Sequence, residues 1–128
     1  MALILVIDDQ KSIRTIIAMV LKTFGHEVEL AEDGRQGIDL LKGLSDFDMV
    51  ITDIKMPNKD GNEVARHVRR SERSNIPVVA ITGFPEEAET ALFDYTITKP
   101  FMLEKLRETV AHLTSRNLPK RASLSEGS

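Results

Sequence analysis

The chain alternates short, almost purely apolar runs with longer stretches in which apolar residues recur every three or four positions. Short runs rich in Val, Ile and Thr are typical of β-strands, whereas the longer period predicts amphipathic helices. The predicted strands are residues 3–7, 28–31, 49–52, 78–82 and 95–98. Strands that alternate with helices indicate an α/β fold with a parallel sheet. The mixed polarity of residues 28–31 predicts an edge strand.

A helix is predicted after each strand. The first has one apolar stripe and ends at Gly25; the stripe is Ile13, Ile16, Ile17, Val20, Leu21 and Phe24. The others are predicted at residues 35–42, 62–72, 86–93 and about 103–115. Residues 1–116 should form one domain. The polar segment 117–128, which contains the helix breaker Pro119, is predicted to be a disordered tail.

Composition narrows the function classes. A chain of 128 residues with 41% hydrophobic content can bury the core of one domain. The absence of cysteine excludes disulfides, thiolate catalysis and zinc–cysteine sites. A net charge of -3 gives no reason to expect nucleic-acid binding, and no apolar run is long enough to span a membrane. Because Met1 and Ala2 lead straight into a strand without a secretory leader, a cytoplasmic location is expected by default.

Candidate chemistry lies where the predicted strands end. Asp8 and Asp9 follow the first strand, Asp53 the third, and Lys99 the fifth, while Thr82 closes the fourth. The carboxyl ends of parallel strands meet at one edge of a sheet, where ligands bind. Three neighbouring carboxylates repel one another unless a cation is present, and Mg²⁺ prefers oxygen ligands. The pattern therefore predicts a magnesium-dependent phosphoryl site.

Each of these residues also has a purely structural explanation. Asp8 and Asp9 would cap a helix, Asp53 would stabilise a turn, and Lys99 would be a solvated charge. Their joint occurrence at the ends of four strands favours a site.

Two other groups of polar residues are assigned no chemistry. The histidines (His26, His67 and His112) do not follow strands and show no metal-ligand spacing. The arginines of residues 62–73 are most simply a solvated helix face; they are Arg66, Arg69, Arg70 and Arg73.

In this order, the strand-end residues resemble the receiver domain of two-component response regulators. The matching pieces are Asp8-Asp9, Asp53-Ile54-Lys55-Met56-Pro57 with Gly61 downstream, Thr82-Gly83 and Lys99-Pro100-Phe101. They span residues 3–115. The resemblance implies a flavodoxin-like, doubly wound sheet of five parallel strands in the order 2-1-3-4-5, with five helices. It also suggests a cis peptide bond before Pro100.

The resemblance implies a magnesium site and a phosphoacceptor. Asp53 would accept the phosphoryl group. Asp9, Asp53 and the backbone carbonyl of Lys55 would ligate Mg²⁺ directly, and Asp8 would hold a metal-bound water.

The resemblance further implies a response to the phosphoryl group. Thr82 would hydrogen-bond one of its oxygens and Lys99 would pair with it. The charge of Lys99 should also keep Asp8 and Asp53 ionised. The donor would be the phosphohistidine of a sensor histidine kinase or a phosphotransfer protein.

The segment from Thr82 to Lys99 departs from the family pattern. It spans seventeen positions (99 minus 82), several fewer than in most receivers. The fourth helix should therefore be short, displaced or poorly ordered. The usual switch aromatic falls on Thr96, and strand alternation sends Tyr95 to the opposite face.

The function expected from these features is a stand-alone receiver. It would signal by contact with a downstream protein, as a monomer or weak dimer, with at most weak autophosphatase activity and no nucleic-acid or membrane partner. An aspartyl-phosphate phosphohydrolase would place Asp-x-Asp after the first strand, and the adjacent Asp8 and Asp9 count against it. A receiver-like module that needs no phosphate is supported only by the shortened segment.

Overall fold

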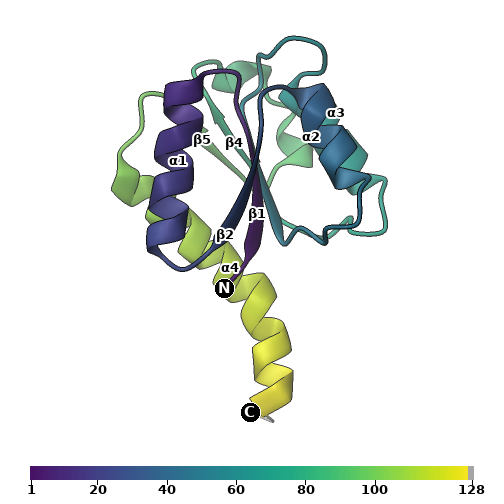
Figure 1. Ribbon diagram of the computed structural model, residues 1–128, viewed down its shortest axis with the longest axis vertical. Coiled ribbons are helices and arrows are strands. Elements are labelled where there is room, and N and C mark those ends of the chain that lie inside the picture. The colour runs from purple at the N-terminus through teal and green to yellow at the C-terminus, as the bar shows by residue number, and fades with distance from the viewer. Residues whose placement is uncertain (127–128) are drawn as a thin grey trace.

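The protein folds into one parallel sheet with helices on both faces (Figure 1). The computed structural model describes the backbone of residues 1–126 and the side chains of residues 1–115. The strands are β1 (Leu3–Ile7), β2 (Glu27–Ala31), β3 (Met49–Thr52), β4 (Val78–Thr82) and β5 (Tyr95–Thr98). Their order is β2-β1-β3-β4-β5. The predicted fold class, strand order and edge position of β2 are confirmed.

Two helices cover each face of the sheet. They are α1 (Lys11–Thr23), α2 (Gly34–Leu41), α3 (Gly61–Arg69) and α4 (Leu103–Glu126). Helices α1 and α4 lie on one face, and α2 and α3 lie on the other (Figure 1). Strands β3 and β4 are buried throughout, because they lie inside the sheet and both faces are covered. This explains why they read as continuous apolar runs in the sequence.

Local signals set the ends of α1 and α3. Gly25 follows α1 with a φ of 88°, a conformation that glycine adopts without strain. Helix α3 begins with a capping box, in which Asp60 accepts a hydrogen bond from the Glu63 amide and the Glu63 carboxylate accepts one from the Asp60 amide. This start fixes Gly61 beside the end of β3, next to the site residue Asp53.

The connection between β4 and β5 contains no continuous helix over residues 86–93. It forms two 3-10 turns, η1 (Pro85–Glu87) and η2 (Thr90–Leu92). We call residues 84–94 the strap. An α-helix satisfies its own backbone groups, whereas the strap bonds to side chains of α3. These long-range partners explain why the short helix expected from the sequence does not form.

Arg69 is the main link between α3 and the strap. Its guanidinium donates hydrogen bonds to the carbonyls of Leu92, Ser74 and Ile76 and to the Asp94 carboxylate. The interpretation of the arginine cluster as a solvated face is therefore wrong for Arg69. Its neighbours on the cluster, Arg66 and Arg73, also form ion pairs, with Glu89 and with Asp46 and Asp48.

Helix α4 is longer than predicted. Its backbone continues past the expected end near Ser115 and through Pro119 to Glu126, beyond the body of the domain (Figure 1). The predicted disordered tail at residues 117–128 falls outside the residues whose side chains are described, so its disorder stays a prediction. In the described part of the chain, no helix is both long and apolar enough to cross a membrane.

His26 should make stability depend on pH. Its Nδ1 accepts a hydrogen bond from the Ala2 amide at 3.1 Å, and burial lowers its pKa below the ordinary 6.5. The unfolded chain therefore binds more protons, and the stabilisation present above pH 6.5 is lost as the pH falls. Urea midpoints at about pH 7.5 and about pH 5.5 should fall more for the wild type than for His26→Gln. Equal falls would contradict this role.

Candidate functional site

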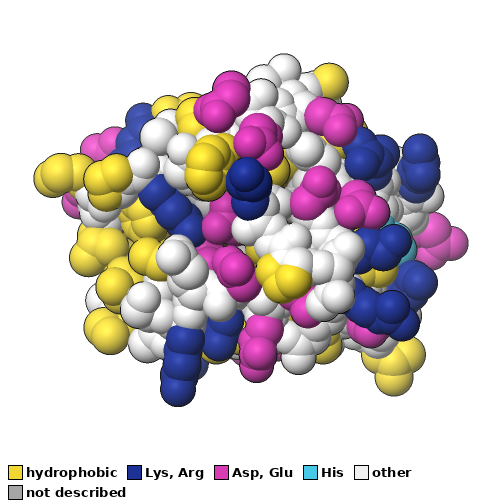
Figure 2. Space-filling model, turned by 90° about the horizontal axis from the view of Figure 1, so that it is seen from above, with side chains coloured by type: hydrophobic (Ala, Val, Ile, Leu, Met, Phe, Trp, Pro, Cys, Tyr) yellow, Lys and Arg dark blue, Asp and Glu magenta, His cyan; other side chains and the backbone are white. Residues whose placement is uncertain are grey.

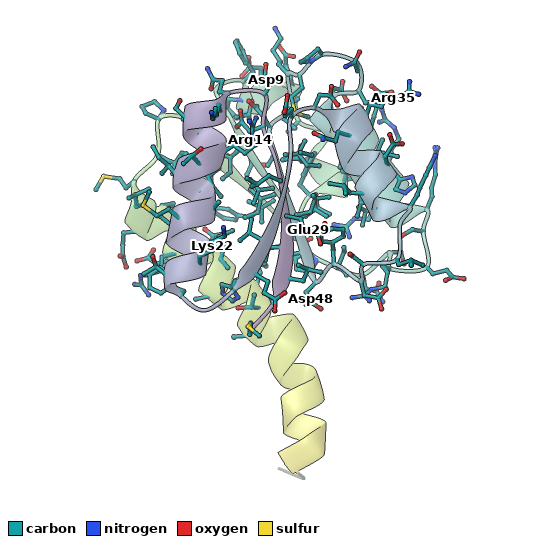
Figure 3. The ribbon with its side chains drawn as sticks, viewed as in Figure 1. Asp9, Arg14, Lys22, Glu29, Arg35 and Asp48 are labelled. Carbon is teal, nitrogen blue, oxygen red and sulfur yellow. The ribbon has the colours of Figure 1, made fainter. Side chains whose placement is uncertain are left out.

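The predicted site residues lie together at the carboxyl edge of the sheet. Figure 2 looks down on this edge and shows acidic side chains gathered across its middle. Figure 3 places Asp9 at the top of the molecule, between β1 and α1, and Asp48 at the opposite end. The structure brings Asp8, Asp53 and Lys99 into direct contact.

Lys99 joins two buried carboxylates. Its Nζ lies 2.8 Å from Asp53 Oδ2 and 3.0 Å from Asp8 Oδ2, and the Lys99 side chain is only 15% exposed. Burial alone lowers the pKa of Lys99, but the hydrogen bonds to Asp53 and Asp8 and the charges of these two carboxylates together outweigh burial and raise the pKa. Lys99 therefore remains a fixed positive charge beside Asp53.

Asp8 is held by the start of the β1–α1 loop. It is 1% exposed, its Oδ1 accepts a hydrogen bond from the Gln10 amide at 2.9 Å, and its carbonyl accepts one from Arg14 at 2.7 Å. The pKa of Asp8 is raised above its ordinary value, because burial of the carboxylate outweighs the bonds from Gln10 and Lys99. Lys99 still lowers the pKa of Asp8, as expected from the sequence, but its effect is smaller than that of burial.

Asp53 is held by hydrogen bonds from both of its neighbours in the chain. Its Oδ1 accepts a hydrogen bond from the Ile54 amide at 2.6 Å, and its carbonyl accepts one from the Thr52 hydroxyl at 2.8 Å. A side chain at Gly61 would clash with this segment, because an added Cβ would lie 2.1 Å from the Asp53 carbonyl oxygen. These hydrogen bonds and the close packing of Gly61 fix the position of the Asp53 carboxylate.

The three carboxylates have the donor atoms of a Mg²⁺ site. Each of Asp8, Asp9 and Asp53 offers an oxygen, and these oxygens lie within 4.8 Å of one another. Asp9 is exposed, which leaves room for the waters that Mg²⁺ retains. Three carboxylates and the Lys99 ammonium sum to a formal charge of -2 (three negative, one positive), which one divalent cation balances.

Thr82 is the last residue of β4, and Lys55 lies two residues after Asp53. The Thr82 hydroxyl, fully buried, accepts a hydrogen bond from the Phe84 amide at 3.0 Å, and its carbonyl accepts one from the Lys99 amide. The exposed Lys55 ammonium lies 3.6 Å from Glu87 Oε2 and 4.4 Å from the centre of the Phe84 ring. The peptide bond between Lys99 and Pro100 is cis, as the sequence suggested.

Sequence reasoning missed Gln10 as a site residue. Its Oε1 accepts a hydrogen bond from Lys99 Nζ at 3.2 Å, so that the three N–H donors of this ammonium are shared among Asp8, Asp53 and Gln10. The only signal in the sequence is its position directly after Asp9, where the first helix starts.

Comparisons with known proteins agree on one family. The family described as response regulator receiver domain matches residues 4–111. The chain is 37% identical over 122 residues to the response regulator MprA of Mycolicibacterium vanbaalenii, a match that covers 91% of this chain and 52% of that protein. The chain thus spans about half the length of this relative.

Two further similarities extend the comparison. Over 82 residues the chain is 43% identical to the CAI-1 autoinducer sensor kinase/phosphatase CqsS of Vibrio cholerae, covering 62% of this chain and 12% of that protein. The solved structure of the response regulator TrrA of Thermotoga maritima, in complex with Mg²⁺ and BeF, superposes with a TM-score of 0.78 at 30% identity. That similarity covers 88% of this chain and 99% of the solved one.

Proposed function

Because the chain belongs to the family of response regulator receiver domains, we propose that Asp53 accepts a phosphoryl group from a phosphohistidine in a Mg²⁺-dependent reaction. The donor is a sensor histidine kinase or a phosphotransfer protein. The observation that carries the proposal is the contact of Lys99 Nζ with both Asp53 and Asp8, at 2.8 and 3.0 Å. This contact places an ammonium beside a carboxylate that the backbone holds in place.

The residues of the site suit Mg²⁺. Asp9, Asp53 and the backbone carbonyl of Lys55 would hold it, and Asp8 would bind through a water. When bound, Mg²⁺ offsets the repulsion between a carboxylate and a phosphoryl group. The convergence of three carboxylates supports this assignment, as does the Mg²⁺ in the TrrA complex.

The chain's own residues then perform the transfer. An oxygen of Asp53 forms the new bond to phosphorus while the phosphorus–nitrogen bond of the donor breaks, and the donor imidazole keeps that electron pair. Lys99 stabilises the negative charge spread over the phosphoryl oxygens, and the Thr82 hydroxyl donates a hydrogen bond to one of them. Positioning and charge are the main contributions of the protein.

Removal of the metal tests this proposal. Acetyl phosphate with Mg²⁺ should add one phosphoryl group, visible by intact-mass spectrometry, and an excess of EDTA should abolish the addition. Restoring Mg²⁺ after EDTA should restore it. Addition that persists in EDTA would argue against a metal-dependent acceptor.

Output is proposed to occur by contact with a downstream protein in the cytoplasm. Receiver domains are phosphoacceptor signalling domains rather than classical enzymes, and at most weak autophosphatase activity is proposed here. The net charge of -3 supports a protein rather than a nucleic acid as the partner. A monomer or weak dimer is the proposed state.

Lys55 should lengthen the life of the phosphoryl group. Lys55 follows Asp53 by two residues, and its side chain is about half exposed. Its ammonium would stabilise the negative charge of the phosphoryl group and block the approach of the attacking water. Because an exposed charge contact contributes up to about 1 kcal/mol, Lys55→Ala should shorten the lifetime roughly twofold to fivefold. Lys59→Ala removes an exposed lysine that pairs with Glu63 and should leave the lifetime unchanged. Equal lifetimes of wild type and Lys55→Ala would contradict this role.

A further inference from the structure

Apart from the bonds of Asp94 with Val78, the strap, residues 84–94, bonds to the rest of the protein in two groups with different partners. One group ties the strap to α3, and the other ties its first residues to the phosphorylation site. Glu87 belongs to both groups, because its carbonyl is bonded by Asn62 while its carboxylate pairs with Lys55.

The α3 group combines a buried side chain, Asn62, with a partly buried one, Arg69. Asn62, only 7% exposed, donates from Nδ2 to the Glu87 carbonyl at 2.8 Å and accepts at Oδ1 from the Glu89 amide at 2.9 Å. Further along, Arg69 donates to the Leu92 carbonyl at 3.0 Å and to Asp94 at 2.9 Å. Asn62 and Arg69 do not belong to the phosphoryl site, so a phosphoryl group on Asp53 would not compete directly for their hydrogen bonds.

The site group is weaker, and its partners are the groups that a phosphoryl group attracts. The Phe84 amide donates to the Thr82 hydroxyl at 3.0 Å. Lys55 lies 3.6 Å from Glu87, beyond hydrogen-bond distance, and both side chains are about half exposed, at 54% and 43%. Solvent screens such an ion pair, so that it contributes little to stability.

We propose that phosphorylation of Asp53 releases the strap at its site end only, while Asn62 and Arg69 keep the rest on α3. This inference rests on the proposed function. An aspartyl phosphate carries about two negative charges, more than the single charge of Glu87, and therefore takes the Lys55 ammonium. Thr82 turns its hydroxyl to the phosphoryl group and leaves the Phe84 amide without its acceptor.

As a consequence, phosphorylation would change the shape and charge of the surface formed by the strap and α3. Once Lys55 has moved, the Glu87 carboxylate and the Phe84 ring are free to change position, beside residues of α3 that stay in place. The altered surface thus lies on the α2 and α3 side of the sheet.

Amide hydrogen exchange with beryllofluoride and Mg²⁺ tests the release residue by residue. The Phe84 amide donates to the Thr82 hydroxyl, and the amides of Glu87 and Ala88 donate to carbonyls within the first 3-10 turn. These three amides should exchange roughly twofold to fivefold faster in the beryllofluoride complex. The amides of Glu89 and Asp94, which bond to Asn62 and to the Val78 carbonyl, should keep their rates. Fluorine NMR of the bound beryllofluoride reports ligand binding independently.

A charge-matched pair of variants isolates the ion pair. Glu87→Gln should raise the exchange of the Glu87 and Ala88 amides before any ligand is added and reduce the further increase on binding. Glu86→Gln removes the same charge one residue earlier, at an exposed position, and should behave like the wild type. The proposed release would be overturned if beryllofluoride bound without changing the exchange of the Phe84, Glu87 and Ala88 amides, or if the amides of Glu89 and Asp94 exchanged equally faster. It would also be overturned if both variants had the same effect. The absence of a bound fluorine signal would overturn the proposed function with it.

Discussion

Asp53→Asn is expected to abolish phosphoryl incorporation completely. The amide has nearly the same shape as the carboxylate, so it can keep the hydrogen bond from the Ile54 amide and the fold around it. It lacks the negative charge and the nucleophilic oxygen that the transfer requires. Incorporation from acetyl phosphate with Mg²⁺, measured by intact mass, should fall to background.

A matched control separates this result from a general effect of lost charge. Asp39→Asn makes the same change at an exposed position on α2 and should keep wild-type incorporation. If Asp53→Asn still gained one phosphoryl group in a Mg²⁺-dependent manner, Asp53 would not be the acceptor.

Gly61→Ala is expected to destabilise the protein by about 3 kcal/mol, a large effect for one methyl group. The added Cβ would lie 2.1 Å from the Asp53 carbonyl oxygen and 3.0 Å from Ile54 Cα. These are backbone atoms, and the Asp53 carbonyl is further held by the Thr52 hydroxyl, so the segment cannot easily retreat. Urea unfolding should show a lower midpoint with an unchanged slope.

Gly83→Ala provides the comparison for Gly61→Ala. No heavy atom lies within 4 Å of a Cβ built at Gly83, so its free energy of unfolding should change by less than about 0.5 kcal/mol. At a compatible helix position Gly→Ala is usually stabilising. A neutral or stabilising Gly61→Ala would therefore show that the β3–α3 connection is softer than its contacts indicate.

The strands and most of the site could be predicted from the sequence because the signals are local. Four of the five strand runs end at or just before a residue that carries the chemistry, and parallel topology brings Asp8, Asp53 and Lys99 together. The opposite orientation of Tyr95 and Thr96 is also local. It is supported by the Lys105 ammonium of α4, which lies 4.9 Å from the centre of the Tyr95 ring.

The strap could not be predicted because its partners are distant in sequence. Arg69 bonds to Leu92 and Asp94, which follow it by 23 and 25 positions. Periodicity describes which face of α3 carries the arginines, not which backbone groups that face meets. The raised pKa of Asp8 was missed for a similar reason, because the depth of burial depends on the whole fold.

The hydrogen bonds at Asp94 also affect the direction in which the Lys99 side chain points. Asp94 accepts hydrogen bonds from Arg69 and from the Val78 amide, at the amino end of the edge strand β5. This fixes the alignment of β5 with β4, and Lys99 follows directly after β5 at its other end. Because a slip of one residue turns every side chain of a strand to the opposite face, it would aim Lys99 away from Asp53. Through Asp94, Arg69 of α3 thus helps to fix the register of the four-residue strand β5, and with it the orientation of Lys99 toward Asp53.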